Sequence, residues 1–282
     1  MRKNMRGLDL IFIVLFILGS ICVANAQHLP FGAESAGIAH ASTAKRGRVG
    51  VYANPAGISA EKEHTFIAGY TSAYGFIEGL STLSMAYLHS LSNAALSLSV
   101  YRFGDEIFSQ HRLSISFGQT INHYSFGIRV NQHQFAMEGA NTRYATAIDV
   151  GGMAKLSQSL RLGVCISNLN QAVVSEETQE KIPVNMSLGL SYTLDKKLST
   201  YAELLHELEE SPVCKVGLSY QAVQKMVLRC GLSTGDQSGL FFGLGLKHSI
   251  LHIDYALEAH SYLGMSHHMN LAYKLNRNVE KE

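Results

Sequence analysis

The chain has 282 residues, of which 46% are hydrophobic and only 16% are charged, and its formal net charge is +1. Such a balance lacks the basic surface that nucleic-acid binding requires, so no nucleic-acid partner is expected. Four prolines and 25 glycines leave little room for a disordered linker or a second domain.

Residues 1–26 have the pattern of a secretory signal peptide. Basic residues at the start precede an apolar run from residue 10 to residue 18, and Ala24-Asn25-Ala26 provides a small-residue cleavage site. We therefore expect export. Beyond this segment no apolar run reaches the roughly 18 residues of a membrane-spanning helix, so only a β-barrel could cross a bilayer.

Residues 27–63 differ from the rest of the chain. Ala, Gly and Ser recur there without the period of a strand, and Asn54-Pro55-Ala56-Gly57 predicts a tight turn. We expect this stretch to form an N-terminal plug-like segment.

From residue 64 to residue 275, apolar side chains fall at every second position. Leu113, Ile115 and Phe117 share one face of an extended strand, and small polar residues such as Ser114 occupy the other face. A face of small polar groups suits the wet interior of a membrane barrel.

The alternation divides this region into about fourteen strands, an even number as expected for a closed, antiparallel, transmembrane β-barrel. The predicted strands cover residues 64–73, 80–89, 93–103, 110–120, 123–135, 143–155, 160–168, 183–193, 197–206, 212–221, 225–234, 238–248, 250–260 and 267–275. Residues 276–282 form a polar C-terminal tail.

Charged residues keep to the polar parity of these strands. This is expected, because Arg or Lys facing lipid at mid-bilayer costs roughly 2 to 4 kcal/mol. The residues that follow the rule include Arg129, Asp149, Arg161, Arg229, Lys247, Asp254, Glu258 and Lys274. Glu203 is left undecided, since apolar groups occupy both parities around it.

Thirteen histidines raise the question of a metal site, and five of them, His248, His252, His260, His267 and His268, lie in the last strands. His248 and His252 could share a strand face, but histidines without a metal are the expectation for a lumen or rim. No nucleophile elbow, phosphate loop or His-Glu-x-x-His motif occurs. The sequence thus predicts no enzyme, no metal and no cofactor, although a barrel can assemble a catalytic set across strands without a sequence motif.

Gly243 and Gly245 lie at inward positions of a predicted strand. Alternate inward glycines remove side chains from the wall and allow a plug or ligand to approach it closely. They are interpreted as strand glycines, not as part of a nucleotide-binding loop.

Several short motifs resemble the PorV/PorQ family. These are Asn54-Pro55-Ala56-Gly57-Ile58, Tyr101-Arg102-Phe103-Gly104-Asp105, Ile253-Asp254-Tyr255-Ala256 and Asn270-Leu271-Ala272-Tyr273-Lys274-Leu275. The resemblance implies a FadL-type outer-membrane barrel of Bacteroidetes-type bacteria, with the N-terminal segment inside the lumen. It marks Phe103, Gly104, Asp105, Asp254, Tyr255 and Tyr273 as family-motif positions. The chain departs from the family at Arg46-Gly47-Arg48, where an acidic residue is usual.

The family resemblance implies a non-enzymatic accessory role in type IX protein secretion, in which the barrel anchors or presents cargo at the cell surface. Its partners would be outer-membrane lipid and other secretion-system proteins or cargo. The alternative is a FadL-like transporter that passes a hydrophobic small molecule across the outer membrane. A third hypothesis, a soluble periplasmic β-sandwich, also explains the alternation but predicts bulky residues on both faces of the strands.

Overall fold

The computed structural model describes residues 31–75, 79–175, 180–208, 210–235, 238–260 and 263–275. The predicted signal peptide and the polar tail lie outside these residues. Within the described ranges, no helix has both the length and the apolar character needed to cross a membrane.

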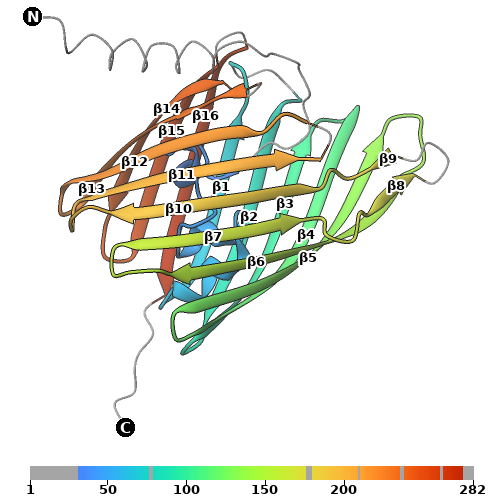
Figure 1. Ribbon diagram of the computed structural model, residues 1–282. Helices are drawn as coiled ribbons and strands as arrows, with labels where there is room; N and C mark the ends of the chain where they lie inside the picture. The colour runs from blue at the N-terminus through green and yellow to red at the C-terminus, as the bar shows by residue number, and fades with distance from the viewer. Residues whose placement is uncertain are drawn as a thin grey trace, which may run out of the picture.

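Fourteen strands close into a single antiparallel barrel (Figure 1). They are β1 His64–Ser72, β2 Ser81–Ser90, β3 Ala94–Gly104, β4 Phe108–Ile121, β5 Tyr124–Met137, β6 Arg143–Lys155, β7 Leu160–Ser167, β10 Asn185–Thr193, β11 Leu198–Glu207, β12 Val213–Val223, β13 Met226–Ser233, β14 Gly239–Lys247, β15 Leu251–His260 and β16 Gly264–Leu275. The first and last strands pair from His64↔Leu275 to Ser72↔His267 and so complete the cylinder. The predicted fold class is confirmed.

The two ends of the barrel differ in the length of their connections. At the end where β16 finishes, the turns cover residues 91–93, 122–123, 156–159, 194–197, 224–225 and 248–250. At the opposite end, which we call the loop end, the connections are longer on average, and the longest covers residues 168–184. Bacterial barrels place short turns on the periplasmic side and longer loops outside.

The connection 168–184 contains a two-stranded hairpin that the sequence did not predict, formed by β8 (Val173–Ser175) and β9 (Glu180–Lys181). It lies where β6 extends past β7, because the β6–β7 pairing stops at Val150↔Ile166. Asn170 side-chain atoms bond Ile148 N and Thr146 O along the remaining edge of β6, at 2.8 Å each. The connection therefore provides hydrogen-bond partners for part of the β6 edge that has no neighbouring barrel strand.

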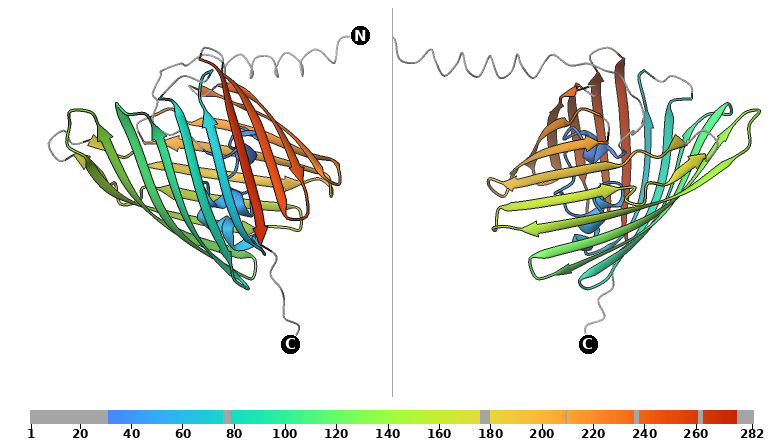
Figure 2. Two further views of the ribbon diagram at one scale, coloured as in Figure 1. Left: turned by 180° about the vertical axis from the view of Figure 1, so that it is seen from behind. Right: turned by 45° about the vertical axis from the view of Figure 1, so that its right-hand side comes forward.

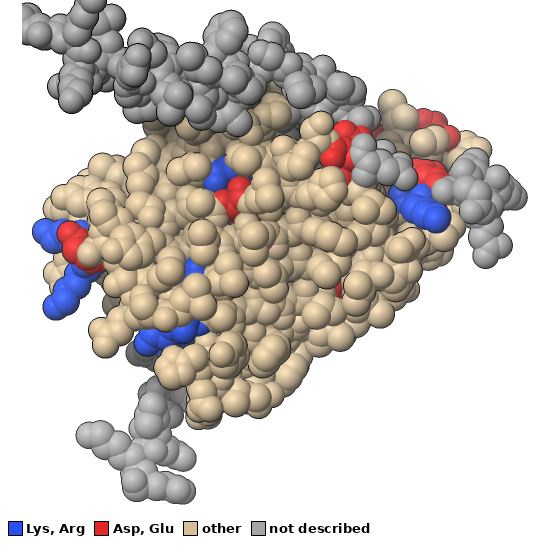
Figure 3. All heavy atoms as spheres, viewed as in Figure 1, with Lys and Arg blue, Asp and Glu red and all other residues tan. Residues whose placement is uncertain are grey.

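The exterior of the barrel is apolar, as the alternation predicted. Leu113 and Ile115 on β4 are 45% and 57% exposed, whereas Ser114 and Ser116 between and beside them are 3% and 1% exposed. On the face in Figure 3, few side chains are charged and uncharged residues cover most of the surface. The sandwich hypothesis is wrong, because the large apolar side chains point out of a closed cylinder and do not meet a second sheet.

Charged side chains on the strands point into the lumen. Arg129, Asp149, Arg229 and Asp254 are all buried, which agrees with the parity rule. Glu203, whose direction the sequence left open, is buried as well and contacts residues inside the barrel.

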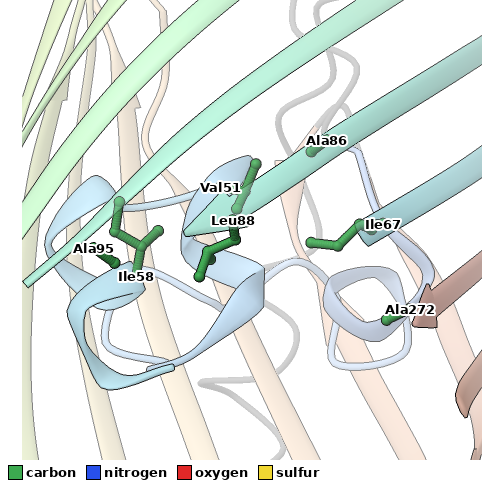
Figure 4. Close-up of a cluster of buried hydrophobic side chains, with 7 residues drawn as sticks. All are labelled: Val51, Ile58, Ile67, Ala86, Leu88, Ala95 and Ala272. Atoms are coloured by element: carbon green, nitrogen blue, oxygen red, sulfur yellow. The ribbon is translucent and has the colours of Figure 1, made fainter. Parts of the chain in front are cut away.

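Residues 31–63 lie inside the barrel, and we call this segment the hatch (Figure 2). It contains a short α-helix, α2 (Ala33–Ala36), and two 3-10 helices, η1 (Arg48–Val51) and η2 (Pro55–Ala60). Val51 and Ile58 of the hatch pack with apolar side chains of β1, β2, β3 and β16. These are Ile67, Ala86, Leu88, Ala95 and Ala272 (Figure 4).

Candidate functional site: the hatch and the lumen

Glycines on the inner wall allow the hatch backbone to approach the strands. A Cβ atom added at Gly127 would overlap the backbone of Pro55 and Ala56, and one added at Gly243 would lie 2.8 Å from Gly37 Cα. The sequence interpretation of Gly243 as a point of close approach agrees with this contact. Any larger residue at these positions requires the hatch or the wall to shift.

A cluster of buried and half-buried charges joins the hatch to β13 and β15. Arg48 Nη2 lies 2.6 Å from Glu34 Oε2 within the hatch and 2.8 Å from Asp254 Oδ2 on the wall. Arg229 Nη1 lies 2.8 Å from Asp254 Oδ1, and Arg229 Nη2 lies 3.6 Å from Glu34 Oε1. Lys45 Nζ completes the group at 3.4 Å from Glu34 Oε1. We call these five residues the Arg48 cluster.

The Arg48 cluster sets three cations against two carboxylates. Burial alone would raise the pKa of the Glu34 carboxyl, but the positive charges of Arg48, Lys45 and Arg229 outweigh it and hold that pKa far below its ordinary value of 4.5. Glu34 is therefore ionised at neutral pH. A buried cluster of this kind stabilises one position of the hatch, because separating the partners would leave uncompensated charge in the lumen.

A second set of contacts ties the middle of the hatch to β11 and β12. The backbone N–H of Thr43 donates to Glu203 Oε2 at 2.8 Å, and Lys215 Nζ lies 3.7 Å from the other oxygen of that carboxylate. Lys45 Nζ donates to Tyr201 Oη at 3.1 Å. Glu203 is thus a lumen residue with a definite role in holding the hatch.

Asn54 caps η2 and also bonds the wall. Its Oδ1 accepts the backbone N–H of Ala56, and its Nδ2 lies within hydrogen-bond distance of Gly152 O at 3.2 Å and Val164 O at 3.0 Å. The tight turn expected from the sequence is the start of this 3-10 helix. Pro55 lies in the first turn of the helix, where a backbone N–H would have no partner within the helix and its absence costs nothing.

Arg129 fastens the hatch to β5. Its Nη1 donates to Val51 O at 2.8 Å, while its Nε donates to Asp149 Oδ2 at the same distance. Asp149 also accepts Asn131 Nδ2 at 2.8 Å and the backbone N–H of Asn168 at 2.9 Å. The sequence located both charges in the lumen but gave no means of finding their hatch partner.

The family-motif positions do not form one site. Asp105 lies in the turn after Gly104, where its Oδ1 accepts the backbone N–H groups of Ile107 and Phe108. Asp254 belongs to the Arg48 cluster, whereas the Tyr255 hydroxyl bonds His267 Nδ1 at 2.7 Å. Phe103 is at a lumen-facing position near the end of β3, and Tyr273 is 42% exposed on the outer face of β16.

The histidine pair singled out in the sequence is not brought together around one site. His252 Nδ1 lies 2.8 Å from Arg48 Nη1, whereas His248 Nδ1 bonds the hydroxyl of its neighbour Ser249 at 3.2 Å.

A cavity of about 80 Å³ lies between the hatch and the wall. Its lining combines aromatic and aliphatic groups with many hydrogen-bonding groups. The lining residues are Phe31, Ser35, His40, Ser42, Thr43, Tyr52, Ala53, Arg129, Cys165, Ser167, Asn185, Ser187, Glu203, Leu205 and Lys215. Its wall residues on β7, β10 and β11 include Ser167, Asn185 and Leu205, which lie near the loop end of those strands.

No family model and no curated protein matches the sequence. The structure, in contrast, is similar to solved outer-membrane channels. The CymD monoaromatic hydrocarbon channel matches with a TM-score of 0.72 at 11% identity, over 89% of this chain and 100% of that chain. The toluene transporter TodX of Pseudomonas putida matches with 0.66 at 12% identity, over 89% and 98%. A FadL homologue of Pseudomonas aeruginosa matches with 0.64 at 11% identity, over 90% and 100%. The chain therefore has the fold of FadL-like channels, and membership of the PorV/PorQ family stays a prediction.

Proposed function

We propose that the protein is an outer-membrane channel for a small hydrophobic molecule and that the hatch is its gate. This is the alternative considered from the sequence, and the shared fold with a hydrocarbon channel and a toluene transporter favours it over an accessory role in secretion. The apolar exterior of the barrel suits a lipid bilayer.

The observation that carries the proposal is the way in which the hatch is held. The polar contacts that join the hatch to the wall are ion pairs and hydrogen bonds, and such contacts can exchange partners. Arg48, for example, can keep Glu34 while it releases Asp254. A segment that fills the lumen but is held by exchangeable contacts can be displaced for passage and can return.

The residues that line the cavity indicate which class of small molecule the channel would carry. Phe31, Tyr52 and Leu205 offer apolar contact, and Ser42, Asn185 and Ser187 offer hydrogen bonds within the same space. Ligand sites that combine an apolar wall with a few polar groups fix the orientation of a molecule that has both characters. A ring with a hydroxyl group fits this lining better than an unsubstituted hydrocarbon does.

Uptake of labelled p-cresol, with toluene and a small sugar for comparison, tests the proposal in cells that carry or lack the gene. We expect deletion to reduce p-cresol uptake several-fold, toluene uptake less, and sugar uptake not at all. Unchanged uptake of both aromatic compounds would contradict a channel function.

The predicted accessory role in type IX secretion rests on the family resemblance. It makes a different prediction for the same deletion strain, in which C-terminally signalled cargo would accumulate in the periplasm. The loop end has seven connections, and only residues 168–184 form a long one. The surface available for cargo recognition is therefore small. For this reason we favour the channel.

A further inference from the structure

A histidine of the hatch meets a histidine and a carboxylate of the wall. His40, Glu258 on β15 and His268 on β16 each place a possible ligand atom so that all three atoms lie within 4.8 Å of one another. His268 Nε2 lies 3.2 Å from Glu258 Oε2, and the rings of His40 and His268 are 5.6 Å apart. Two ligand atoms on one tetrahedral zinc ion are separated by about 3.3 Å, given metal–ligand bonds of about 2.0 Å.

The ligand set is typical of a transition metal. Two imidazole nitrogens and one carboxylate oxygen form the protein half of many zinc sites that keep a fourth position for water. The side chain of His268 is also oriented from behind, because its Nδ1 lies 3.1 Å from the hydroxyl of Thr71 on the neighbouring strand β1. A partner on the second ring nitrogen is the usual support of a metal-binding histidine, since it directs the first nitrogen toward the metal.

The hatch backbone presents His40 in an unusual conformation. Ala39 and His40 have φ values of 55° and 58°, so two consecutive residues other than glycine occupy the left-handed region. Such conformations cost free energy and occur preferentially at functional sites. His40 also lines the cavity between the hatch and the wall.

We propose that His40, Glu258 and His268 bind a divalent transition-metal ion of the Zn²⁺ class and that the bound ion fastens the hatch to the wall. The metal site itself does not depend on what the channel carries, whereas its part in gating rests on the proposed function. Neither the sequence motif search nor the spacing of histidines could reveal the site, since His40 lies 218 positions before Glu258 and 228 before His268.

Metal binding by the full chain in detergent tests the site. After removal of metal with a chelator, Zn²⁺ is titrated and its stoichiometry is measured by equilibrium dialysis. We expect one site that loses at least about tenfold in affinity in His40→Gln and in His268→Gln. His64→Gln is the matched control, because His64 stacks on His89 with ring centroids 4.4 Å apart near the opposite end of the barrel, away from the proposed site. Equal Zn²⁺ affinity in wild type, His40→Gln and His268→Gln would overturn the proposal.

The fastening is tested by hydrogen exchange of hatch residues 36–44 with and without Zn²⁺. We expect Zn²⁺ to slow exchange several-fold in the wild type and in His64→Gln but not in His40→Gln, whose barrel strands are unaltered. Exchange that does not respond to Zn²⁺ in the wild type would overturn the fastening. Neither measurement depends on transport, so both results can still be interpreted if the channel proposal fails.

Discussion

At the scale of single residues, Arg48 joins the hatch to two wall residues, His252 and Asp254. It contacts Glu34, His252 and Asp254 at 2.6 to 2.8 Å and is the only hatch cation within this distance of Asp254 among the described residues. Its removal would leave the buried carboxylate of Asp254 with Arg229 alone, and Glu34 with Arg229 and Lys45 at 3.6 and 3.4 Å.

We therefore expect Arg48→Ala to release the hatch. Breaking a buried ion pair by removing one partner costs about 3 to 5 kcal/mol, which exceeds the roughly 0 to 1 kcal/mol of an exposed pair. Hydrogen exchange of residues 31–63 should rise strongly, while the barrel strands stay protected. Arg143→Ala is the control, since Arg143 forms an exposed pair with Glu180 at 3.7 Å. Equal exchange in the two variants would contradict the assigned role of Arg48.

The contribution of Glu34 to hatch stability should depend on pH. Because its pKa in the folded protein is depressed, the contribution is fully present above the ordinary value of 4.5 and is lost as the pH falls through the depressed pKa. A nitroxide at Ser42→Cys, read by EPR with the native cysteines replaced, should report growing hatch mobility as the pH falls below 4.5. In Glu34→Gln the hatch should already be mobile at neutral pH and show little further change. If Glu34→Gln shows the same pH response as the wild type, another titratable group is responsible for that response.

The inner-wall glycines give a steric prediction. Gly127→Ala should displace η2, because the new Cβ would overlap backbone atoms of Pro55 and Ala56 that no rotamer change can move. Gly152→Ala is a matched control on the neighbouring strand, where the new Cβ meets only Val164 Cγ2 at 3.3 Å. Proteolysis of the hatch in detergent distinguishes them: Gly127→Ala should be cut faster than wild type and Gly152→Ala at the wild-type rate.

The candidate site was only partly predictable from these residues. Asn54 and Pro55 have a local signature, since a capping amide before proline specifies a turn or a short helix regardless of the rest of the chain. Arg48 and Asp254 have none, because their pairing depends on how the hatch lies in a barrel whose far wall is about 200 residues further along the chain. The alternation of the strands shows which charged residues face the lumen, but it does not show which hatch residue each of them contacts.

At the scale of elements, the strands were predictable because the barrel wall has two opposite solvents. An apolar outer face and a polar inner face impose a strict period of two, and all fourteen predicted ranges overlap the observed strands. The hairpin β8–β9 was missed, since it is short and lies outside the wall pattern. Its apolar residues instead pack over β6, where Ala145, Ala147 and Ala172 form a small buried cluster.

The parity of the wall can be tested directly. Ile128→Arg places a charge on the lipid face at a cost of roughly 2 to 4 kcal/mol and should impair assembly of the barrel. Ser187→Arg introduces the same side chain at an inward position that borders the cavity and should assemble. Heat-modifiable gel mobility of membrane fractions measures the folded share. Equal losses would mean that the two faces have been assigned wrongly.

At the scale of the whole molecule, the protein combines a rigid wall with a segment that can be displaced. The wall is closed by fourteen antiparallel strands, and the hatch belongs to none of them. The hatch packs against the wall through the cluster around Val51 and Ile58, through two smaller apolar clusters that include Ala33 and Ile38, and through the polar contacts described above. Movement of the hatch is therefore the change in structure that requires the least disruption of the wall.

The most direct test of this account is a reversible covalent lock between hatch and wall. Thr43 and Gly189 face each other across the boundary, because a Cβ at Gly189 would lie 3.0 Å from Thr43 Cβ and 2.9 Å from Ala44 N. The hatch must therefore move back by about 0.5 Å to reach the roughly 3.5 to 4.5 Å between the Cβ atoms of a disulfide. Thr43→Cys/Gly189→Cys is made in a chain whose native cysteines are replaced, and p-cresol uptake is measured in cells before and after reduction. We expect uptake to be blocked in the oxidised protein and to recover on reduction. Equal uptake in the two states would show that passage does not require the hatch to move.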